Sequence, residues 1–181
     1  MNKPALAAVI LAALATPALG AHSIGVYEDQ LAQDCEISDP GGAVTKTFYV
    51  VVTNAPIAFG GSVWKLEWDA GMTMTWIGDD TSPYFTVGNA KDGVSIAYSP
   101  CLGGTFKIDA VTMMSFGTST PCSRFRLVPH PTQGGPMSLT CGGFSPLPIV
   151  PGEGIVNANG TCTCNVAVAP TTWGSVKALY R

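Results

Sequence analysis

The sequence predicts an all-β domain, a sandwich of two antiparallel sheets followed by a short C-terminal helix. Three observations predict this class. Short apolar or alternating runs recur along the chain, and residues that favour turns break them, with 21 Gly and 14 Pro in the 181-residue sequence. Only 12% of the residues are charged, a profile that suits an extracellular β-domain. No long amphipathic helix separates two strands, which argues against a parallel sheet with crossover helices.

Three strands are expected in the first part of the chain, over residues 24–27, 45–53 and 62–69, with a loop over residues 54–61. Apolar side chains recur at every second position of the second strand. The third strand is the clearest, because Trp64, Leu66 and Trp68 alternate with the charged Lys65 and Glu67. This period of two is that of a strand with one buried face.

Turn residues separate the remaining strands, which we expect over residues 72–77, 84–87, 94–98, 105–116, 123–128, 137–141 and 164–169. Residues 129–136 are rich in Pro and Gly, so the strands on either side of them are expected to pair as a hairpin. Residues 144–151 contain repeated prolines, which predicts an irregular or edge segment.

The segment 171–181 is the part of the sequence that looks helical. Thr171 or Thr172 can cap its start, and Trp173, Val176 and Tyr180 recur at i, i+3 and i+7. A helix this short needs a surface to dock on. We expect it to dock either on its own domain or, as an interaction tail, on another protein.

The first twenty residues have the layout of a secretory signal peptide. Lys3 precedes an uncharged apolar run, Pro17 ends that run, and Ala18 and Gly20 precede the expected cleavage site. The run is shorter than the roughly 20 residues that span a membrane. We therefore expect a signal peptide over 1–20, a mature domain over 21–170 without a transmembrane segment, and a location that is secreted, periplasmic or at the cell surface.

Six cysteines remain in the mature chain, and in an oxidising compartment an even set predicts disulfides. They are Cys35, Cys101, Cys122, Cys141, Cys162 and Cys164. The expected hairpin places Cys122 opposite Cys141, so we predict a disulfide between them. Cys35 is expected to bond Cys162 or Cys164. A zinc site is the competing interpretation, but the paired Cys-x-x-Cys spacing of structural zinc sites is absent.

Net charge and motifs exclude several function classes. The mature chain has 8 Lys and Arg against 12 Asp and Glu, which does not favour binding to nucleic acid. Motifs of serine hydrolases, zinc proteases, P-loop proteins and dinucleotide-binding proteins are absent. His130 lies between two prolines and is interpreted as a loop residue. No cofactor is expected, although the acidic residues near Glu28 and the Asp79-Asp80 pair leave a structural calcium open.

The tryptophans suggest a glycan-binding platform. Trp64, Trp68 and Trp76 would offer flat rings on which sugars stack if they shared one exposed face. The alternative is that they pack in the core, because Leu66 lies between two of them and each aromatic side chain buries a large area.

Residues 45–128 resemble cohesin modules in the order and spacing of their strands. The likeness rests on Val-Val-Val-Thr-Asn54, on Gly61 to Asp69, and on the later segments Gly93 to Tyr98 and Gly104 to Asp109. It implies an immunoglobulin-like or cohesin-like jelly-roll sandwich and, as in that family, protein attachment outside bacterial cells. The segments around Gly25 and from Trp173 to Arg181 also resemble those of exported bacterial proteins.

The function expected from these observations is that of a secreted, non-enzymatic adhesion, structural or protein-interaction module. Its partner would be a protein or a glycan at the cell surface. The alternative is a carbohydrate-binding module that uses the tryptophans. A small secreted hydrolase is the third hypothesis.

Overall fold

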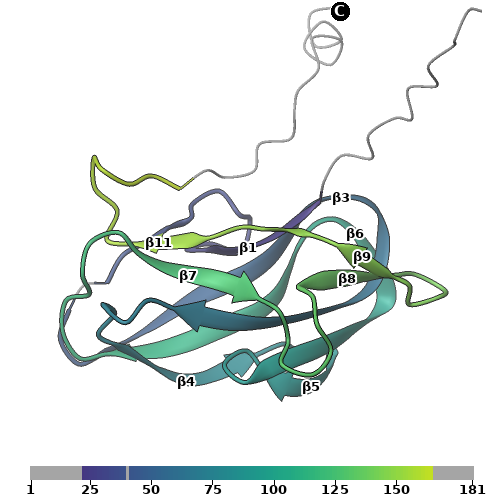
Figure 1. The fold of residues 1–181 in the computed structure, drawn as a ribbon, viewed down its shortest axis with the longest axis horizontal. Coiled ribbons are helices and arrows are strands. Elements are labelled where there is room, and N and C mark those ends of the chain that lie inside the picture. Colours follow the sequence, from purple (N-terminus) through teal and green to yellow (C-terminus); the bar gives the residue numbers. More distant parts are fainter. Residues whose placement is uncertain (1–21, 40, 165–181) are drawn as a thin grey trace, which may run out of the picture.

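The computed structural model describes residues 22–39 and 41–164. This part is built from strands, which confirms the all-β class (Figure 1). The strands are β1 (Ser23–Tyr27), β2 (Glu36–Ile37), β3 (Val44–Trp68), β4 (Met74–Asp80), β5 (Phe85–Asn89), β6 (Gly93–Ser115), β7 (Ser123–Val128), β8 (Met137–Thr140), β9 (Pro146–Pro148), β10 (Val150–Pro151) and β11 (Gly154–Val156). The expected signal peptide, the expected strand beyond Cys164 and the expected helix over 171–181 lie outside the described residues.

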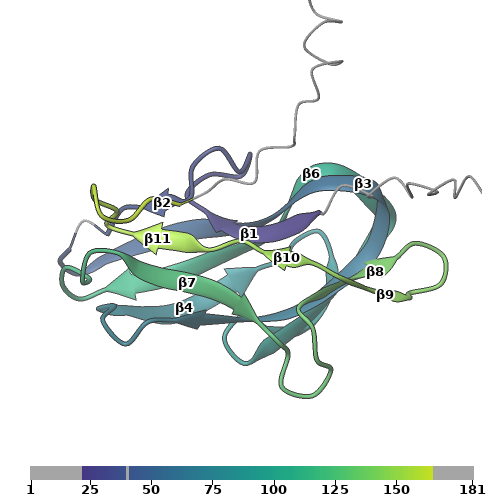
Figure 2. The same ribbon diagram turned by 45° about the horizontal axis from the view of Figure 1, so that its top comes forward.

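The long strand β3 organises the fold, because it pairs with β1, β6, β7 and β8. Its pairings join all eleven strands into one hydrogen-bonded network, with a main path β10-β1-β3-β7-β11-β2. β3 belongs to two groups of ladders, one with β1, β4, β5, β6, β8, β9 and β10 and the other with β2, β7 and β11, so the sheets that the sequence predicted are continuous through this strand. In the ribbon views β3 curves round near β8 and β9, and its two halves lie in facing layers (Figures 1 and 2). The pairs β1–β10 and β2–β11 are parallel, and the other ladders are antiparallel.

Two segments expected to interrupt strands are instead parts of β3 and β6. The expected loop over 54–61 belongs to β3, and the expected break between residues 98 and 105 belongs to β6. The irregular residues of the two strands face each other, with Ala55 opposite Gly104 and Phe59 opposite Leu102. Register shifts separate these pairs, and bulges of this kind bend a strand while its pairing continues. Small residues and Asn suggest a turn in the sequence, but here they accommodate that bend.

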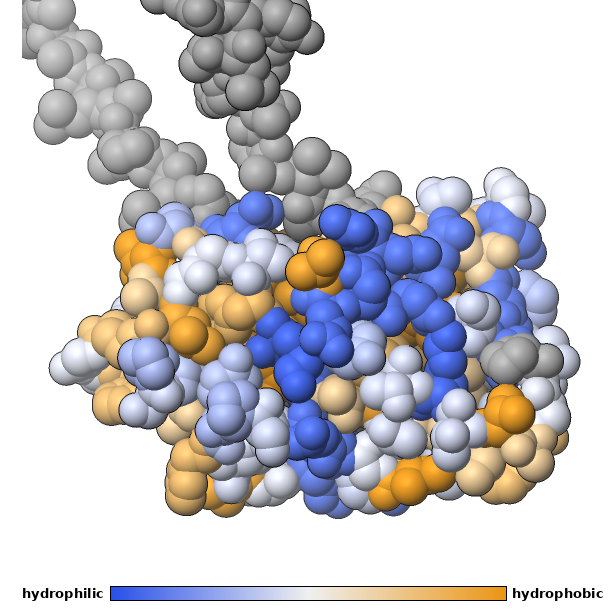
Figure 3. All heavy atoms as spheres, turned by 180° about the vertical axis from the view of Figure 1, so that it is seen from behind, coloured by the Kyte–Doolittle hydropathy of each residue, from blue (hydrophilic) through white to orange (hydrophobic). Residues whose placement is uncertain are grey.

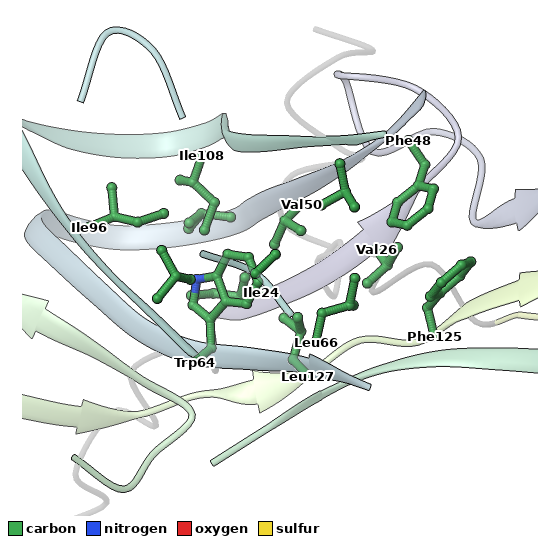
Figure 4. Close-up of a cluster of buried hydrophobic side chains, with 14 of the residues drawn as sticks. Ile24, Val26, Phe48, Val50, Trp64, Leu66, Ile96, Ile108, Phe125 and Leu127 are labelled. Carbon is green, nitrogen blue, oxygen red and sulfur yellow. The ribbon is translucent and has the colours of Figure 1, made fainter. Parts of the chain in front are cut away.

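The core lies between the layers and is apolar. Trp64 and Leu66 of β3 face Ile108 of β6, and Phe125 and Leu127 of β7 close the same cluster (Figure 4). All five side chains are buried, and the rings of Phe48 and Phe125 lie 4.3 Å apart between centroids. The alternation of Trp64 and Leu66 with Lys65 thus marks a strand with one face in the core, as expected.

Three disulfides join the six cysteines: Cys35–Cys164, Cys101–Cys141 and Cys122–Cys162. The predicted bond between Cys122 and Cys141 is wrong. Its premise was a hairpin of β7 and β8, but each strand pairs with a different part of β3. The expectation that Cys35 bonds one of the two C-terminal cysteines is confirmed.

Candidate functional site

Strand β5 turns large apolar side chains toward solvent. Phe85 and Val87 are 73% and 61% exposed, whereas Thr86 between them is half-buried. A strand with one buried face normally points its apolar residues inward and its polar residues outward. The pattern of β5 is inverted, and large exposed apolar side chains grouped together are typical of an interaction site.

The pairing of four strands places a shallow groove beside Phe85. Phe85 lies opposite Ala97 of β6, which lies opposite Gly61 of β3, which lies opposite Leu139 of β8. Because the two middle residues are small, this row leaves a hollow of about 200 Å³ between its larger ends. We call it the Phe85 groove, lined by Ser62, Val63, Phe85, Val87, Ser95, Ile96, Ala97, Gln133, Leu139 and Phe144.

Glycines in β3 are required for this shape. A Cβ atom on Gly61 would lie 2.5 Å from the carbonyl oxygen of Ile96, which no side chain can tolerate. A Cβ atom on Gly60 would lie 3.3 Å from Cε1 of Phe144, so the Phe144 ring lies directly over this residue. Both glycines thus allow close approach of neighbouring groups along the groove.

Phe144 borders the far end of the groove from an unusual backbone conformation. It has a φ of 48°, in the left-handed region that bulky residues rarely adopt, and it is 60% exposed. The β8–β9 turn holds it there, because the amide of Phe144 donates to the carbonyl of Thr140 at 3.1 Å. The disulfide from Cys141 to Cys101 ties the same turn to β6. Strain that the surrounding structure maintains at an exposed aromatic residue points to a functional role.

The floor of the groove is fixed and carries no charge. The hydroxyl of Tyr98 donates a 2.6 Å hydrogen bond to Oγ of Ser62, and burial raises the pKa of Tyr98. At the rim, Oγ of Ser95 donates to Oε1 of Gln133 at 3.1 Å. None of the lining residues is acidic or basic. The groove is therefore suited to hold apolar side chains and offers no group for acid–base chemistry.

Apolar side chains are exposed elsewhere as well. Figure 3 shows hydrophobic patches on both sides of a hydrophilic band on the face opposite to that of Figure 1. Phe116, for example, is 67% exposed and does not line the groove. Single exposed apolar residues are common on soluble proteins, so grouping around a groove is what distinguishes Phe85, Val87 and Phe144.

The structure does not assemble the three tryptophans into an exposed platform. Trp64 is fully buried, and Trp68 and Trp76 are half-buried against the core. Trp68 lines a second shallow groove of about 380 Å³ with Lys65, Leu66, Glu67, Lys91 and Asp92. The amine of Lys91 lies 5.9 Å from the ring centroid of Trp76. Of the predicted set, Trp68 therefore borders an open groove.

The two histidines and the acidic residues near Glu28 do not come together as a catalytic or metal site. The ring centroids of His22 and Phe59 lie 4.4 Å apart, and Nδ1 of His130 faces the hydroxyl of Thr132. Glu28 pairs with Lys46. Among residues 22–39 and 41–164, no three His, Cys, Asp or Glu side chains are grouped in a way that could hold a metal ion. The interaction-tail residues Trp173, Val176 and Tyr180 lie outside the described residues.

The structure buries a carboxyl group that has no hydrogen-bond partner. Asp109 of β6 is fully buried, and neither of its side-chain oxygens has a hydrogen-bond partner. Burial, reinforced by the nearby Asp79, raises the pKa of Asp109 to about 8. The pKa of Asp79 is also raised by burial. Neither Asp109 nor Asp79 lines the Phe85 groove.

No protein-family model and no curated protein sequence matches this chain. Solved structures do match. A type I cohesin in a cohesin–dockerin complex from Clostridium thermocellum is 11% identical with a TM-score of 0.53, over 77% of this chain and 99% of that one. A type II cohesin from the cellulosome of Acetivibrio cellulolyticus is also 11% identical with a TM-score of 0.53, over 76% and 95% of the two chains. The chain has a cohesin-like fold.

A non-cellulosomal cohesin from the archaeon Archaeoglobus fulgidus is also similar in structure, at 13% identity and a TM-score of 0.51 over 78% of this chain and 93% of that one. This confirms the resemblance to cohesins that the strand spacing suggested. At these identities the likeness concerns the fold. In the described parts of the chain, no helix has the length and apolar character needed to cross a membrane.

Sequence reasoning missed the residues that form the groove. Residues 84–87 were expected as a strand, but Phe85, Val87 and Phe144 were not singled out. The available signal was Thr86 between two large apolar residues in a short strand. Nothing local in the sequence says which face of that strand is buried.

Proposed function

We propose that this cohesin-like protein is an exported, non-enzymatic module that binds another protein through the Phe85 groove. The observation that carries the proposal is the group of exposed Phe85, Val87 and Phe144 around an uncharged groove whose floor is fixed. Aromatic side chains beside a rigid groove are typical of the residues that contribute most of the binding energy at protein interfaces. The cohesin of similar fold from Clostridium thermocellum was solved in complex with a dockerin, which supports a protein partner.

An exterior location is part of the proposal. Three disulfides among the described residues support it, because such bonds persist in oxidising compartments. The signal-like start of the sequence supports it independently. The partner would be a protein exposed to the same compartment, in an adhesive or structural assembly.

Site-specific cross-linking in the producing cells tests this function. A photoreactive phenylalanine analogue is placed at Val87 or, as the matched control, at Phe116, which is equally exposed but outside the groove. We expect a protein adduct from position 87 that is lost when Phe85→Asp is added, and no adduct from position 116. Adducts of equal yield from both positions, or none from position 87, would refute the proposal.

A second candidate function is glycan binding at the groove beside Trp68. The observation in its favour is the combination of a half-buried indole with Lys65, Glu67, Lys91 and Asp92, since sugars are held by an aromatic surface and polar side chains together. Calorimetric titration with a panel of soluble oligosaccharides tests it. Binding that Trp68→Ala removes and Phe85→Asp leaves intact would establish this site in place of the Phe85 groove.

A further inference from the structure

We infer that the occupant of the Phe85 groove is the segment 171–181 of a second copy of this chain, so that copies associate head to tail. The inference rests on the proposed function and names its partner. Three features of the chain support it: the spacing of apolar residues in the segment, the division of charge between the domain and the segment, and the place where the described chain ends.

The apolar residues of the segment suit an uncharged groove. Trp173, Val176 and Tyr180 recur at i, i+3 and i+7, which places them on one side of a helix. An amphipathic helix binds other proteins by laying such a side into a hydrophobic groove. The Phe85 groove has apolar ends at Phe85 and Leu139 and no charged lining residue, so it complements this pattern.

Charge is divided unequally between the domain and the segment. The described residues contain all 12 Asp and Glu of the sequence but only six Lys and Arg. Residues 165–181 contain Lys177 and Arg181 and no acidic residue. A basic segment is attracted to an acidic domain, and this attraction speeds the encounter of the two surfaces.

The place where the described chain ends favours a second copy over the same copy. Cys164 is bonded to Cys35, so the segment starts from a fixed point next to β2. In Figure 1 the described chain ends at the upper left, beyond β11, whereas β8 lies on the right and β5 at the lower right. Residues 165–170 span at most about 20 Å when fully extended. A contact between different surfaces of two copies is heterologous and continues into rings or filaments.

A complementation experiment with the full mature chain, residues 21–181, tests the inference. Phe85→Asp disables the groove, Trp173→Asp disables the segment, and Phe116→Asp is the matched surface control. Sedimentation velocity is run from about 1 to about 100 µM, the range in which weak protein contacts are measurable. We expect the parent chain and Phe116→Asp to associate as concentration rises, and each of the two disabled variants to stay monomeric.

Mixing the two disabled variants gives the decisive result. One variant keeps its segment and the other keeps its groove, so the mixture is expected to form dimers of one copy of each and nothing larger. A mixture that stays monomeric, or a parent chain that is monomeric at every concentration, would overturn the inference. Circular dichroism and thermal unfolding identify a variant that fails to fold, in which case Val87→Asp replaces Phe85→Asp and Tyr180→Asp replaces Trp173→Asp.

The cross-linking at Val87 separates failure of this inference from failure of the proposed function. An adduct with the mass of two copies of this chain supports both. An adduct with a different protein, together with a monomeric parent chain, overturns the head-to-tail contact and leaves the proposed function standing. The absence of any adduct and of any association refutes both.

Discussion

Cys141 is bonded to Cys101 immediately before the glycines that lead to Phe144, so a disulfide fixes the turn that carries an exposed aromatic residue with a positive φ. The bond closes a loop with a sequence separation of 40 residues. The disulfide Cys122–Cys162 has the same separation but lies away from the groove, among residues whose side chains do not line it. The two disulfides therefore close loops of equal length, but Cys101–Cys141 fixes a turn at the groove and Cys122–Cys162 does not.

Removing each of these disulfides separates stability from function. In the chain-entropy description, a loop of this length contributes about 4 kcal/mol to the free energy of unfolding. We expect Cys101→Ser with Cys141→Ser, and Cys122→Ser with Cys162→Ser, to lose similar amounts in urea unfolding. Only the first pair should also weaken cross-linking at Val87, because it releases the turn of Phe144. Equal cross-linking by both double variants would show that the turn does not contribute to binding.

Replacing Phe144 by Asn relieves backbone strain in the β8–β9 turn and removes an aromatic ring from the groove. Asn tolerates the left-handed conformation of this position, and the Phe144 side chain is mostly exposed, so the variant should unfold with a free energy equal to the parent or about 0.5–1 kcal/mol higher. The aromatic ring is removed from the groove, so the yield of the Val87 adduct should fall by about tenfold or more. A stable variant with unchanged cross-linking would exclude Phe144 from the binding surface.

The local pattern of the sequence predicted the all-β class and the buried side of β3. Trp64 and Leu66 alternate with Lys65, and this alternation alone identifies which side chains enter the core. The bend of β3 was not predictable in the same way, because Asn54 and the Gly60-Gly61 pair fit a turn as well as a bulge. Only pairing with β6 decides between them. The three-residue strand β11 and the two-residue β10 are too short to show a period.

The candidate site depends on pairing between distant residues, which no local pattern contains. Phe85, Ala97, Gly61 and Leu139 form a row across four strands, and the groove exists because the two middle residues of that row are small. The wrong disulfide has the same cause. Cys122 and Cys141 flank a Pro- and Gly-rich turn, yet β7 and β8 pair with successive parts of β3, so the expected hairpin does not form.

The register of β3 makes a direct prediction about stability. Leu66 is buried in the core, so Leu66→Ala should lower the free energy of unfolding by about 2–5 kcal/mol, as the cavity left by a buried leucine does. Lys65, next to it, faces outward and pairs with Glu67 at 3.0 Å near the surface. Lys65→Ala should change stability by no more than about 0.5 kcal/mol. Similar losses at both positions, measured by urea unfolding, would contradict the assigned register.

The buried carboxyl of Asp109 predicts how stability depends on pH. Its pKa is raised to about 8 by burial and by Asp79, while in the unfolded chain an Asp has a pKa of about 3.9. Between these values the folded state keeps a proton that the unfolded state has lost. The free energy of unfolding therefore falls as pH rises from about 4 to about 8, and this contribution levels off above that range.

Asp109→Asn removes this contribution, because an amide stays neutral at every pH in the range. Each unit of pKa difference corresponds to about 1.4 kcal/mol, so the variant should gain stability over the parent progressively from pH 5 to pH 8, by a few kcal/mol in total. Some pH dependence remains in the variant, because burial also raises the pKa of Asp79. Urea unfolding at both pH values measures the change, with Glu36→Gln as a control at an exposed carboxyl. The free energies of unfolding of Asp109→Asn and the parent could instead differ by the same amount at pH 5 and pH 8. Asp109 would then be ionised in the folded protein, with charged partners rather than burial determining its ionisation.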